Sequence, residues 1–177
     1  EALKPPYEEV ADYVRQQDIA HADETHWPGG TDKKGWLWMC GGPTAAFFMI
    51  QASRSQRAAR ALLGAFAGVL VTDRYNAYRF FGALRQICWA HLKRDFKAIS
   101  EAGGKLGEIG DQLHDLSNEI LKLRRRVRDG TLQWQTFQCR MPDLQKRQKE
   151  CQVAHLDLQL PAEWIRMLIF SRNMEEA

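Results

Sequence analysis

Two aspartates, Asp23 and Asp73, carry the clearest chemical signal in this 177-residue sequence. Asp23 lies in the segment HADETHW, and Asp73 directly follows the apolar run GVLVT. A pair of carboxylates supplies the oxygen ligands that Mg²⁺ or Mn²⁺ prefers. Two such ions about 3.5–4 Å apart can activate an attacking hydroxyl and stabilise the leaving oxygen of a phosphodiester. Each aspartate taken alone is also compatible with a turn or a helix cap.

The segments around the two aspartates indicate how they would meet. Residues 19–25 alternate between apolar and polar types, as a strand does. Residues 68–73 form a short apolar strand that ends in an acid, which is typical of the centre of an α/β sheet. Ligands of such sheets bind beside the carboxyl ends of the strands. We therefore expect both aspartates at the ends of neighbouring strands, with their carboxylates about 4–6 Å apart.

The remaining patterns up to residue 92 predict an α/β fold with a mixed sheet. The other expected elements are a helix over 6–17, a turn over 27–30, a hairpin over 36–40 and 45–51, a helix over 56–66, a helix over 75–81 and a strand over 84–89. Ser53 or Ser55 is expected to cap the helix over 56–66, and Gly68 is expected to end it.

The chain becomes helical in character after residue 92. Apolar residues recur at alternating intervals of three and four, which is a heptad seam. Its members are Leu106, Ile109, Leu113, Leu116, Ile120, Leu123 and Val127. Pro142 can begin a second helix, over residues 142–160. We expect a helical hairpin inserted beside the sheet, and a coiled-coil dimerisation arm is the alternative. Trp134 is expected in the core of the hairpin, and stacking on a flipped nucleic-acid base is the alternative for this residue.

Charge is distributed unevenly, although the formal net charge is only +3. Residues 1–27 carry seven acids and two bases, a net of −5, whereas residues 28–97 carry eleven bases and three acids, a net of +8. A basic block around a few acids suits a protein that binds phosphate groups, and a solvated basic surface is the alternative. The same two interpretations apply to a run of four arginines, namely Arg124, Arg125, Arg126 and Arg128.

Five motifs follow one another along the chain: HADETHW, KGWLW, SRS, GVLVTDRYNAY and CWAHLKRDF. In this order they closely resemble the insertion sequence 66 family of transposases. The resemblance implies a ribonuclease-H-like, integrase-type fold. It also implies metal-dependent DNA strand cleavage and transfer by an Asp-Asp-Glu triad. Asp23 matches the first acid of that triad and Asp73 matches the second, so both are expected to be catalytic metal ligands.

The third acid is where the sequence departs from the family pattern. In the family, a helix with an NNxxER-like motif supplies it, whereas this chain ends SRNMEEA. Asn173 and Glu176 keep an Asn-x-x-Glu spacing, but Glu176 is next to the end of the chain and is a weak candidate. We expect a truncated or frameshifted chain that binds DNA but cuts it poorly.

Residues beside the second acid are expected to contact DNA. Arg74, Tyr75 and Tyr78 follow Asp73 closely. A cation with aromatic rings can hold a DNA backbone or stack on an unpaired base. Core packing of one tyrosine is the alternative.

The last motif begins with a Cys-x-x-His element, Cys88 and His91. We expect His91, Lys93 and Arg94 to contact DNA phosphates. A zinc site with Cys151 and His155 as its second half is one alternative, because zinc needs four ligands. A satisfied histidine at a strand end is the other.

The sequence predicts residues 1–92 as the ribonuclease-H-like core with the first two acids, 93–160 as a helical insertion, and 161–177 as the start of the C-terminal part of the core. No apolar run approaches the roughly 18 residues that span a bilayer, and no secretory signal is present. We expect a homo-oligomer in the bacterial cytoplasm, on the nucleoid, that acts on transposon ends and target DNA. Two alternative functions remain open: another nuclease of the same fold, and an inactive DNA-binding or assembly remnant.

Overall fold

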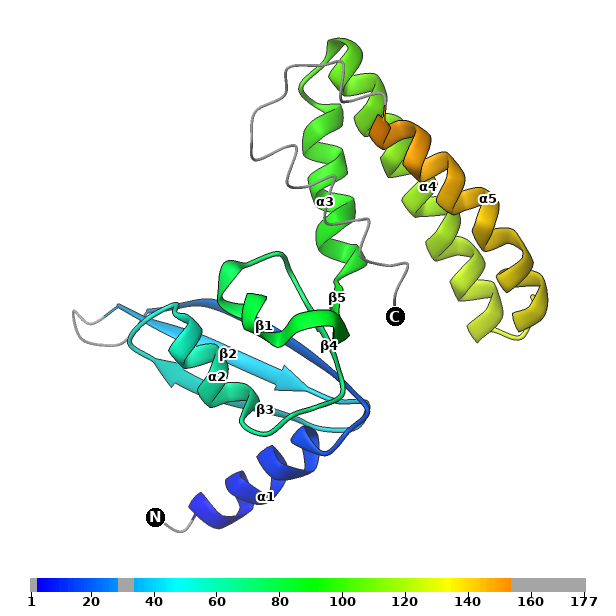
Figure 1. Ribbon diagram of the computed structural model, residues 1–177. Helices are drawn as coiled ribbons and strands as arrows, with labels where there is room; N and C mark the ends of the chain where they lie inside the picture. The colour runs from blue at the N-terminus through cyan, green and yellow to red at the C-terminus, as the bar shows by residue number, and fades with distance from the viewer. Residues whose placement is uncertain (1–2, 29–33, 154–177) are drawn as a thin grey trace. The chain divides into compact units, whose positions relative to one another are not determined.

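The computed structural model of the protein describes residues 3–28 and 34–153. These residues divide into two compact units at residue 88. The first unit contains α1 (Lys4–Arg15), β1 (Ile19–Pro28), β2 (Lys34–Gly41), β3 (Ala46–Gln51), α2 (Gln56–Leu63), β4 (Val69–Thr72), the 3₁₀ helix η1 (Asn76–Leu84) and β5 (Arg85–Ile87). The second contains α3 (Trp89–Ser100), α4 (Gly104–Arg128) and α5 (Trp134–Val153), and Figure 1 labels these elements.

Within the described residues, the first unit is built on a five-stranded mixed sheet of order β3-β2-β1-β4-β5. β1 and β2 pair antiparallel, as do β2 and β3, which confirms the predicted hairpin. β4 pairs in parallel with β1 on one side and with β5 on the other. The strands that carry Asp23 and precede Asp73 are therefore neighbours, as expected.

Asp23 lies within β1 and not at its end, so that part of the prediction was wrong. The parallel pairing of β1 with β4 stops at His21 and Val71. β1 continues beside β2 as far as Pro28, with Asp23 opposite Met39. The long antiparallel partner extends β1 beyond the point where the short strand β4 ends. Residues 29 and 30 of the predicted turn lie outside the described residues.

One face of the sheet forms the core of the first unit. Ala20, Ala22 and Glu24 of β1 are buried at alternating positions, because successive side chains of a strand point to opposite faces. Asp23 therefore projects from the other face. The largest buried side chains of this core, which α1, α2 and η1 complete, are Val14, Trp38, Cys40, Leu62, Leu63, Leu70 and Tyr78.

Helix α2 confirms one boundary prediction and corrects another. Ser55 is the N-cap, and its hydroxyl oxygen accepts the backbone N–H of Ala58 at 3.3 Å. Gly64, with a φ of 54°, ends the helix in place of Gly68. Gly68 instead precedes β4, where an added Cβ would lie 2.4 Å from the carbonyl oxygen of Asp18. A glycine is needed there because the two backbones approach so closely.

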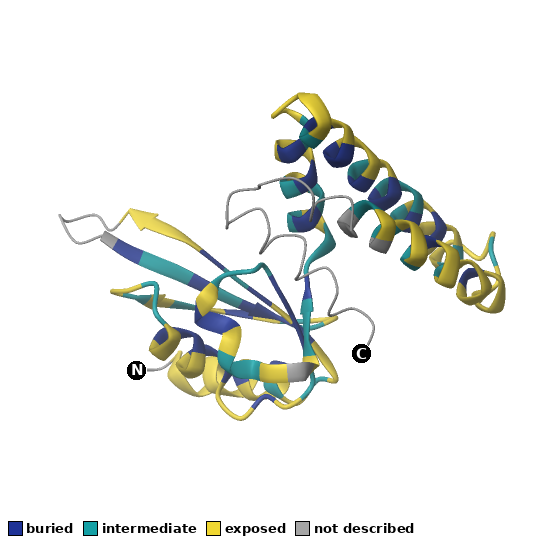
Figure 2. Ribbon diagram, turned by 45° about the horizontal axis from the view of Figure 1, so that its top comes forward, coloured by how far each residue is buried: buried dark blue, intermediate teal, exposed yellow. Residues whose placement is uncertain are grey.

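The heptad seam of α4 is buried, as predicted. Ile109, Leu113, Leu116, Ile120 and Leu123 are all buried along one stripe. The stripe packs against α5, where Phe137 and Leu144 join the cluster. α4 also packs along α3, so the expected hairpin is part of a three-helix arrangement in the described residues. Figure 2 shows the buried residues on the facing sides of these helices.

The start of α5 differs from the prediction. The helix begins at Trp134 and contains Pro142 in its interior. Trp134 stacks on Phe137 but keeps 48% of its surface exposed, so it is not a core residue. Residues 154–160 of the predicted helix lie outside the described residues. No helix in the described part of the chain is long and apolar enough to cross a membrane.

Candidate functional site

Asp23 and Asp73 lie together in the first unit. Each offers one carboxylate oxygen, and these two atoms are within 4.8 Å of each other. Asp23 projects from β1, and Asp73 is the first residue after the neighbouring strand β4. The separation agrees with the expected range. Their role as metal ligands stays a prediction.

The residues around Asp73 hold it in one orientation. Its Oδ1 accepts the backbone N–H of Tyr75 at 2.9 Å. Arg85, from β5, donates to the carbonyl oxygen of Asp73 at 2.6 Å and to Oγ1 of Thr72 at 2.8 Å. The Asp73 side chain is 19% exposed. These hydrogen bonds hold Asp73 in place, and its side chain keeps enough exposed surface to reach a ligand.

Glu24 is a buried carboxylate that the sequence analysis missed. Its side chain has no exposed surface. Tyr78 donates its hydroxyl to Oε2 at 2.5 Å, and Arg54 donates from Nε to Oε1 at 2.8 Å. Burial raises the pKa of Glu24, whereas the hydrogen bonds from Tyr78 and Arg54 lower it. A buried carboxylate with this many donors is a structural anchor.

Arg54 connects Glu24 with Asp73. Its Nη2 lies 2.7 Å from Oε1 of Glu24 and 3.9 Å from Oδ2 of Asp73. The guanidinium lies over the ring of Tyr75 at 3.8 Å and near Trp36 at 5.1 Å. Burial lowers the pKa of Arg54, but the hydrogen bond and charge of Glu24 outweigh it, so the pKa is raised. Arg54 is therefore a firmly charged group beside the acid pair, and one third of its side chain is exposed.

Both missed residues had a signal in the sequence. Glu24 shares its strand face with Ala20 and Ala22, and an acid on a face of small apolar residues points to a buried partner. Arg54 stands in the SRS motif, between the two serines that were predicted as helix caps. The sequence does not show that Arg54 and Glu24, 30 residues apart, meet.

The residues that were predicted to contact DNA differ in burial and in the unit that carries them. Tyr78 is fully buried and donates to Glu24, so it has no surface for DNA and that prediction needs correction: Tyr78 is the tyrosine that packs in the core. Tyr75 is half-buried, with its hydroxyl donating to the carbonyl oxygen of Arg54 at 2.6 Å, and Arg74 is half-buried beside it. The other three predicted contacts lie on α3 of the second unit, namely His91, Lys93 and Arg94.

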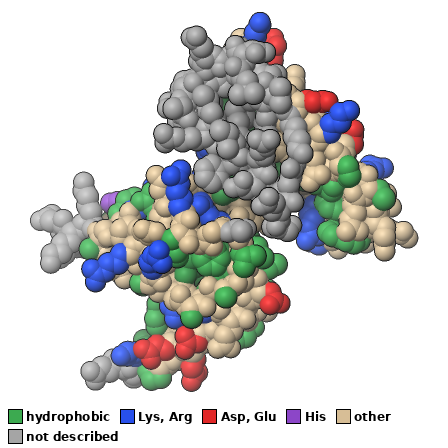
Figure 3. Space-filling view, viewed as in Figure 1, with side chains coloured by type: hydrophobic (Ala, Val, Ile, Leu, Met, Phe, Trp, Pro, Cys, Tyr) green, Lys and Arg blue, Asp and Glu red, His purple; other side chains and the backbone are tan. Residues whose placement is uncertain are grey.

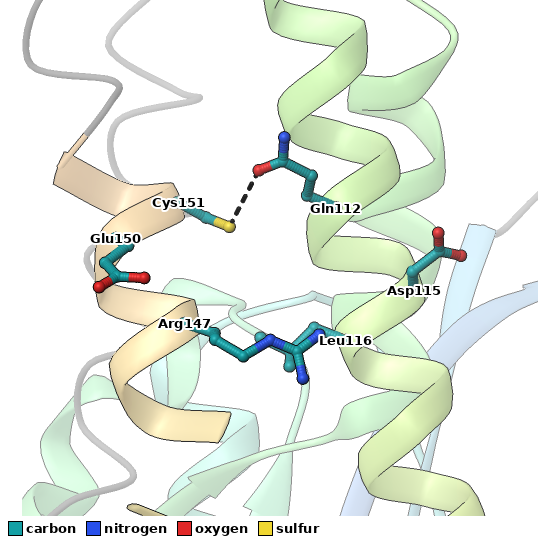
Figure 4. Close-up of a pocket in the computed structure, with 6 residues that line it drawn as sticks. All are labelled: Gln112, Asp115, Leu116, Arg147, Glu150 and Cys151. Atoms are coloured by element: carbon teal, nitrogen blue, oxygen red, sulfur yellow. Dashed lines mark hydrogen bonds between the residues drawn. The ribbon is translucent and has the colours of Figure 1, made fainter. Parts of the chain in front are cut away.

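A cavity of about 430 Å³, lined mostly by polar side chains, lies between α4 and α5 (Figure 4). Cys151 donates its thiol to Oε1 of Gln112 at 3.3 Å, and burial raises the pKa of Cys151. Arg147 pairs with Glu119 at 2.8 Å. The hydrogen bond with Gln112 supports a structural role for the Cys151 thiol. His155, the proposed companion ligand, lies outside the described residues.

The uneven charge of the sequence also marks the surface of the first unit. Acidic side chains gather over α1, and basic ones gather over α2 (Figure 3). On α1 the exposed acids are Glu8, Glu9 and Asp12, and on α2 the exposed bases are Arg57 and Arg60. The basic surface is thus separate from the acidic helix.

Comparison with known proteins extends these observations. The family model described as "Transposase IS66 family" matches residues 1–162. The "Uncharacterized protein y4jD" of Sinorhizobium fredii (strain NBRC 101917 / NGR234) is 25% identical over 152 residues. That alignment covers 71% of this chain and 29% of the relative, so the chain spans less than a third of the relative's length. No solved structure matches the chain.

Proposed function

This chain belongs to the IS66 family of transposases, and we propose that its first unit is a ribonuclease-H-like core for metal-dependent DNA cleavage and strand transfer. The observation that carries the proposal is the pair of carboxylate oxygens of Asp23 and Asp73, within 4.8 Å of each other. The mixed sheet, with β1 beside β4, supports the fold assignment. We propose the helical unit as the insertion into this core.

The donor set suits Mg²⁺ or Mn²⁺. Both side chains are carboxylates, the hard oxygen donors that these ions prefer. Asp73 keeps part of its surface exposed, which leaves room for the water ligands that Mg²⁺ retains. When bound there, the ion would supply activation of the attacking oxygen and stabilisation of the leaving oxygen.

The protein residues around the pair hold it ready for that chemistry. Arg85 holds the side-chain hydroxyl of Thr72 and the backbone carbonyl of Asp73 through hydrogen bonds of 2.8 and 2.6 Å. Arg54, anchored on buried Glu24, acts as a positioning residue for Asp73. Orientation of ligands by such outer contacts typically changes metal affinity by about 10–100-fold.

DNA is the proposed substrate, in the form of transposon ends and target. We propose that Arg74 and Tyr75, which adjoin Asp73 in the chain, contact it near the reacting phosphate. His91, Lys93 and Arg94 are proposed contacts from α3. Self-association on paired DNA ends belongs to the same proposal.

Metal binding tests the site without requiring turnover. The variants are Asp23→Asn and Asp73→Asn, with Asp18→Asn, an exposed acid of the same unit, as the matched control. We expect Mn²⁺ binding, measured by electron paramagnetic resonance, to weaken at least about tenfold in the first two and to stay unchanged in the control. Equal affinity in all four proteins would contradict the proposed site.

A plasmid assay tests the reaction itself. Mn²⁺-dependent nicking of supercoiled DNA that is lost in Asp73→Asn supports the enzyme. Nicking of equal strength in Asp73→Asn would count against it. Carboxylate-dependent Mn²⁺ binding with DNA retention but no nicking would favour a DNA-binding or assembly role.

A further inference from the structure

We propose that the groove between α3 and α4 is a second DNA-binding surface, which holds the phosphate backbone of a duplex. The inference rests on the proposed function, because it takes DNA to be the substrate. The groove measures about 550 Å³ and is lined by Ala90, Lys93, Arg94, Lys97, His114 and Leu121. It joins two residues already expected to contact DNA with two that no motif indicates, Lys97 and His114.

The α3 side of the groove is strongly cationic. Lys93, Arg94 and Lys97 line it, and none of the described lining residues is acidic. Lys93 and Lys97 are one helical turn apart, about 6 Å along the axis. Lys97 forms an ion pair with Glu101 at 4.0 Å, but both side chains are about two-thirds exposed, 69% and 68%. An ion pair this exposed contributes little to the free energy of folding. Lys97 can therefore exchange Glu101 for a phosphate.

The α4 side extends the same charge along the helix. His114 and Leu121 line the groove, and His114 forms a hydrogen bond with Asn118 at 3.3 Å. Steps of four and three residues from Leu121 reach Arg125 and Arg128, which are exposed on the same face. From His114 to Arg128 this face extends about 21 Å, the length of roughly six base pairs. A surface of that length fits a duplex backbone better than a single anion.

The two apolar residues that line the groove favour phosphate contacts over base recognition. Ala90 and Leu121 are apolar and can support the methylene stems of the lysines while the charged ends reach outward. Contacts of this kind position DNA without reading its sequence. An anionic membrane is a poorer partner, because the apolar residues of α3, namely Leu92, Phe96 and Ile99, are buried in the unit.

The packing of the two helices makes the groove a preformed surface. An added Cβ at Gly110 would lie 2.2 Å from the backbone nitrogen of Ser100, so the end of α3 sits directly on α4. Ser100 also donates its hydroxyl to Oδ1 of Asp111 at 2.5 Å. Because the helices are held at this distance, DNA binding does not require them to rearrange.

Charge removal in the full chain tests the inference. The groove variant combines Lys93→Gln, Arg94→Gln and Lys97→Gln. The matched control combines Lys105→Gln, Lys122→Gln and Lys146→Gln, which removes three exposed charges from the same unit outside the groove. Binding of a fluorescent 30-base-pair duplex is measured by anisotropy over a salt series. Each lost phosphate contact should reduce the slope of log K against log salt by about 0.9.

We expect the groove variant to lose about 2–3 from the salt slope and at least about tenfold in affinity at low salt, with little change in the control. Groove and control variants that agree within twofold in affinity, with equal slopes, would overturn the inference. If the wild-type chain does not bind the duplex, that result would instead contradict the proposed function. Unchanged Mn²⁺ binding in the groove variant keeps the two cases apart.

Lysine footprinting on the wild-type chain covers the case in which the groove variant fails to fold. Acetylation of Lys93 and Lys97 is measured by mass spectrometry with and without duplex DNA. We expect both to be protected at least about threefold, and Lys105 and Lys146 to be unaffected. Equal labelling of all four lysines with and without DNA would reject the groove as the binding surface.

Discussion

Arg54 holds Glu24 through two of its nitrogens: Nε and Nη2 lie 2.8 and 2.7 Å from the same carboxylate oxygen. Glu24 is the next residue after Asp23, and Arg54 also lies 3.9 Å from Asp73. One guanidinium therefore connects the backbone beside the first acid with the side chain of the second. We therefore expect the geometry of the acid pair to depend on the ion pair of Arg54 with Glu24, whose buried side chain lies on the opposite face of β1 from Asp23.

Arg54→Lys should weaken Mn²⁺ binding by about tenfold while the protein stays folded. Lysine keeps the positive charge but lacks the planar fork that contacts Glu24 and Asp73 together. Residues that orient metal ligands typically change affinity by this order. The measurement is a Mn²⁺ titration alongside thermal unfolding. Arg57→Lys, exposed on α2, is the control, and wild-type affinity in Arg54→Lys would argue against the positioning role.

Tyr78→Phe should reduce the free energy of unfolding by about 1.5–3 kcal/mol. The substitution removes the hydroxyl that Glu24 accepts at 2.5 Å inside the core, and hydrogen bonds to charged groups contribute this much. Urea denaturation measures the change. Tyr13→Phe removes an exposed hydroxyl that bonds to Thr44 and should change stability by less than about 0.5 kcal/mol. Equal effects of the two substitutions would show that the buried contact is unimportant.

Gly110→Ala should destabilise the helical unit even though alanine is the better helix former. Helix propensity alone favours alanine by about 1 kcal/mol. The new Cβ, however, would lie 2.2 Å from the backbone of Ser100, and overpacking of this kind typically costs about 1–3 kcal/mol. The loss is measured by denaturant unfolding of the full chain. Asp115→Ala, at an exposed position of α4, reports propensity alone, and a gain in stability for Gly110→Ala would disprove the close packing.

Cys40 should resist thiol reagents that react quickly with Cys139. Burial raises the pKa of Cys40 from 9.0 to about 11, whereas Cys139 is exposed. Between pH 9.0 and about 11, the Cys40 thiol therefore keeps its proton in the folded state and loses it in the unfolded chain. This contribution to stability is complete below pH 9 and is lost as the pH rises through about 11. Labelling with a chromogenic disulfide at pH 8 should show a fast phase that Cys139→Ser removes, and loss of that phase in Cys40→Ser would contradict the burial.

Local patterns in the sequence predicted most of the elements because their causes are local. The alternation around residues 19–25, the apolar run before Asp73 and the heptad from Leu106 to Val127 each depend on neighbours a few positions away. Their ends were harder to predict. The end of α2 at Gly64 and the start of α5 at Trp134 depend on packing, which overrides signals such as Gly68 and Pro142.

The sequence by itself determined the two aspartates as the candidate acids, the neighbouring strands that carry them and the family resemblance of the motifs around them. Only the tertiary structure decided that Tyr78 is core and that Glu24 and Arg54 form the anchor beside the pair. The physical reason is that burial and ion pairing depend on which segments meet across the sheet. Glu24 and Arg54 are 30 residues apart, and Tyr78 is 54 residues from Glu24. No periodicity within β1 or α2 carries that information, since it comes from the folding of the sheet against its covering helices.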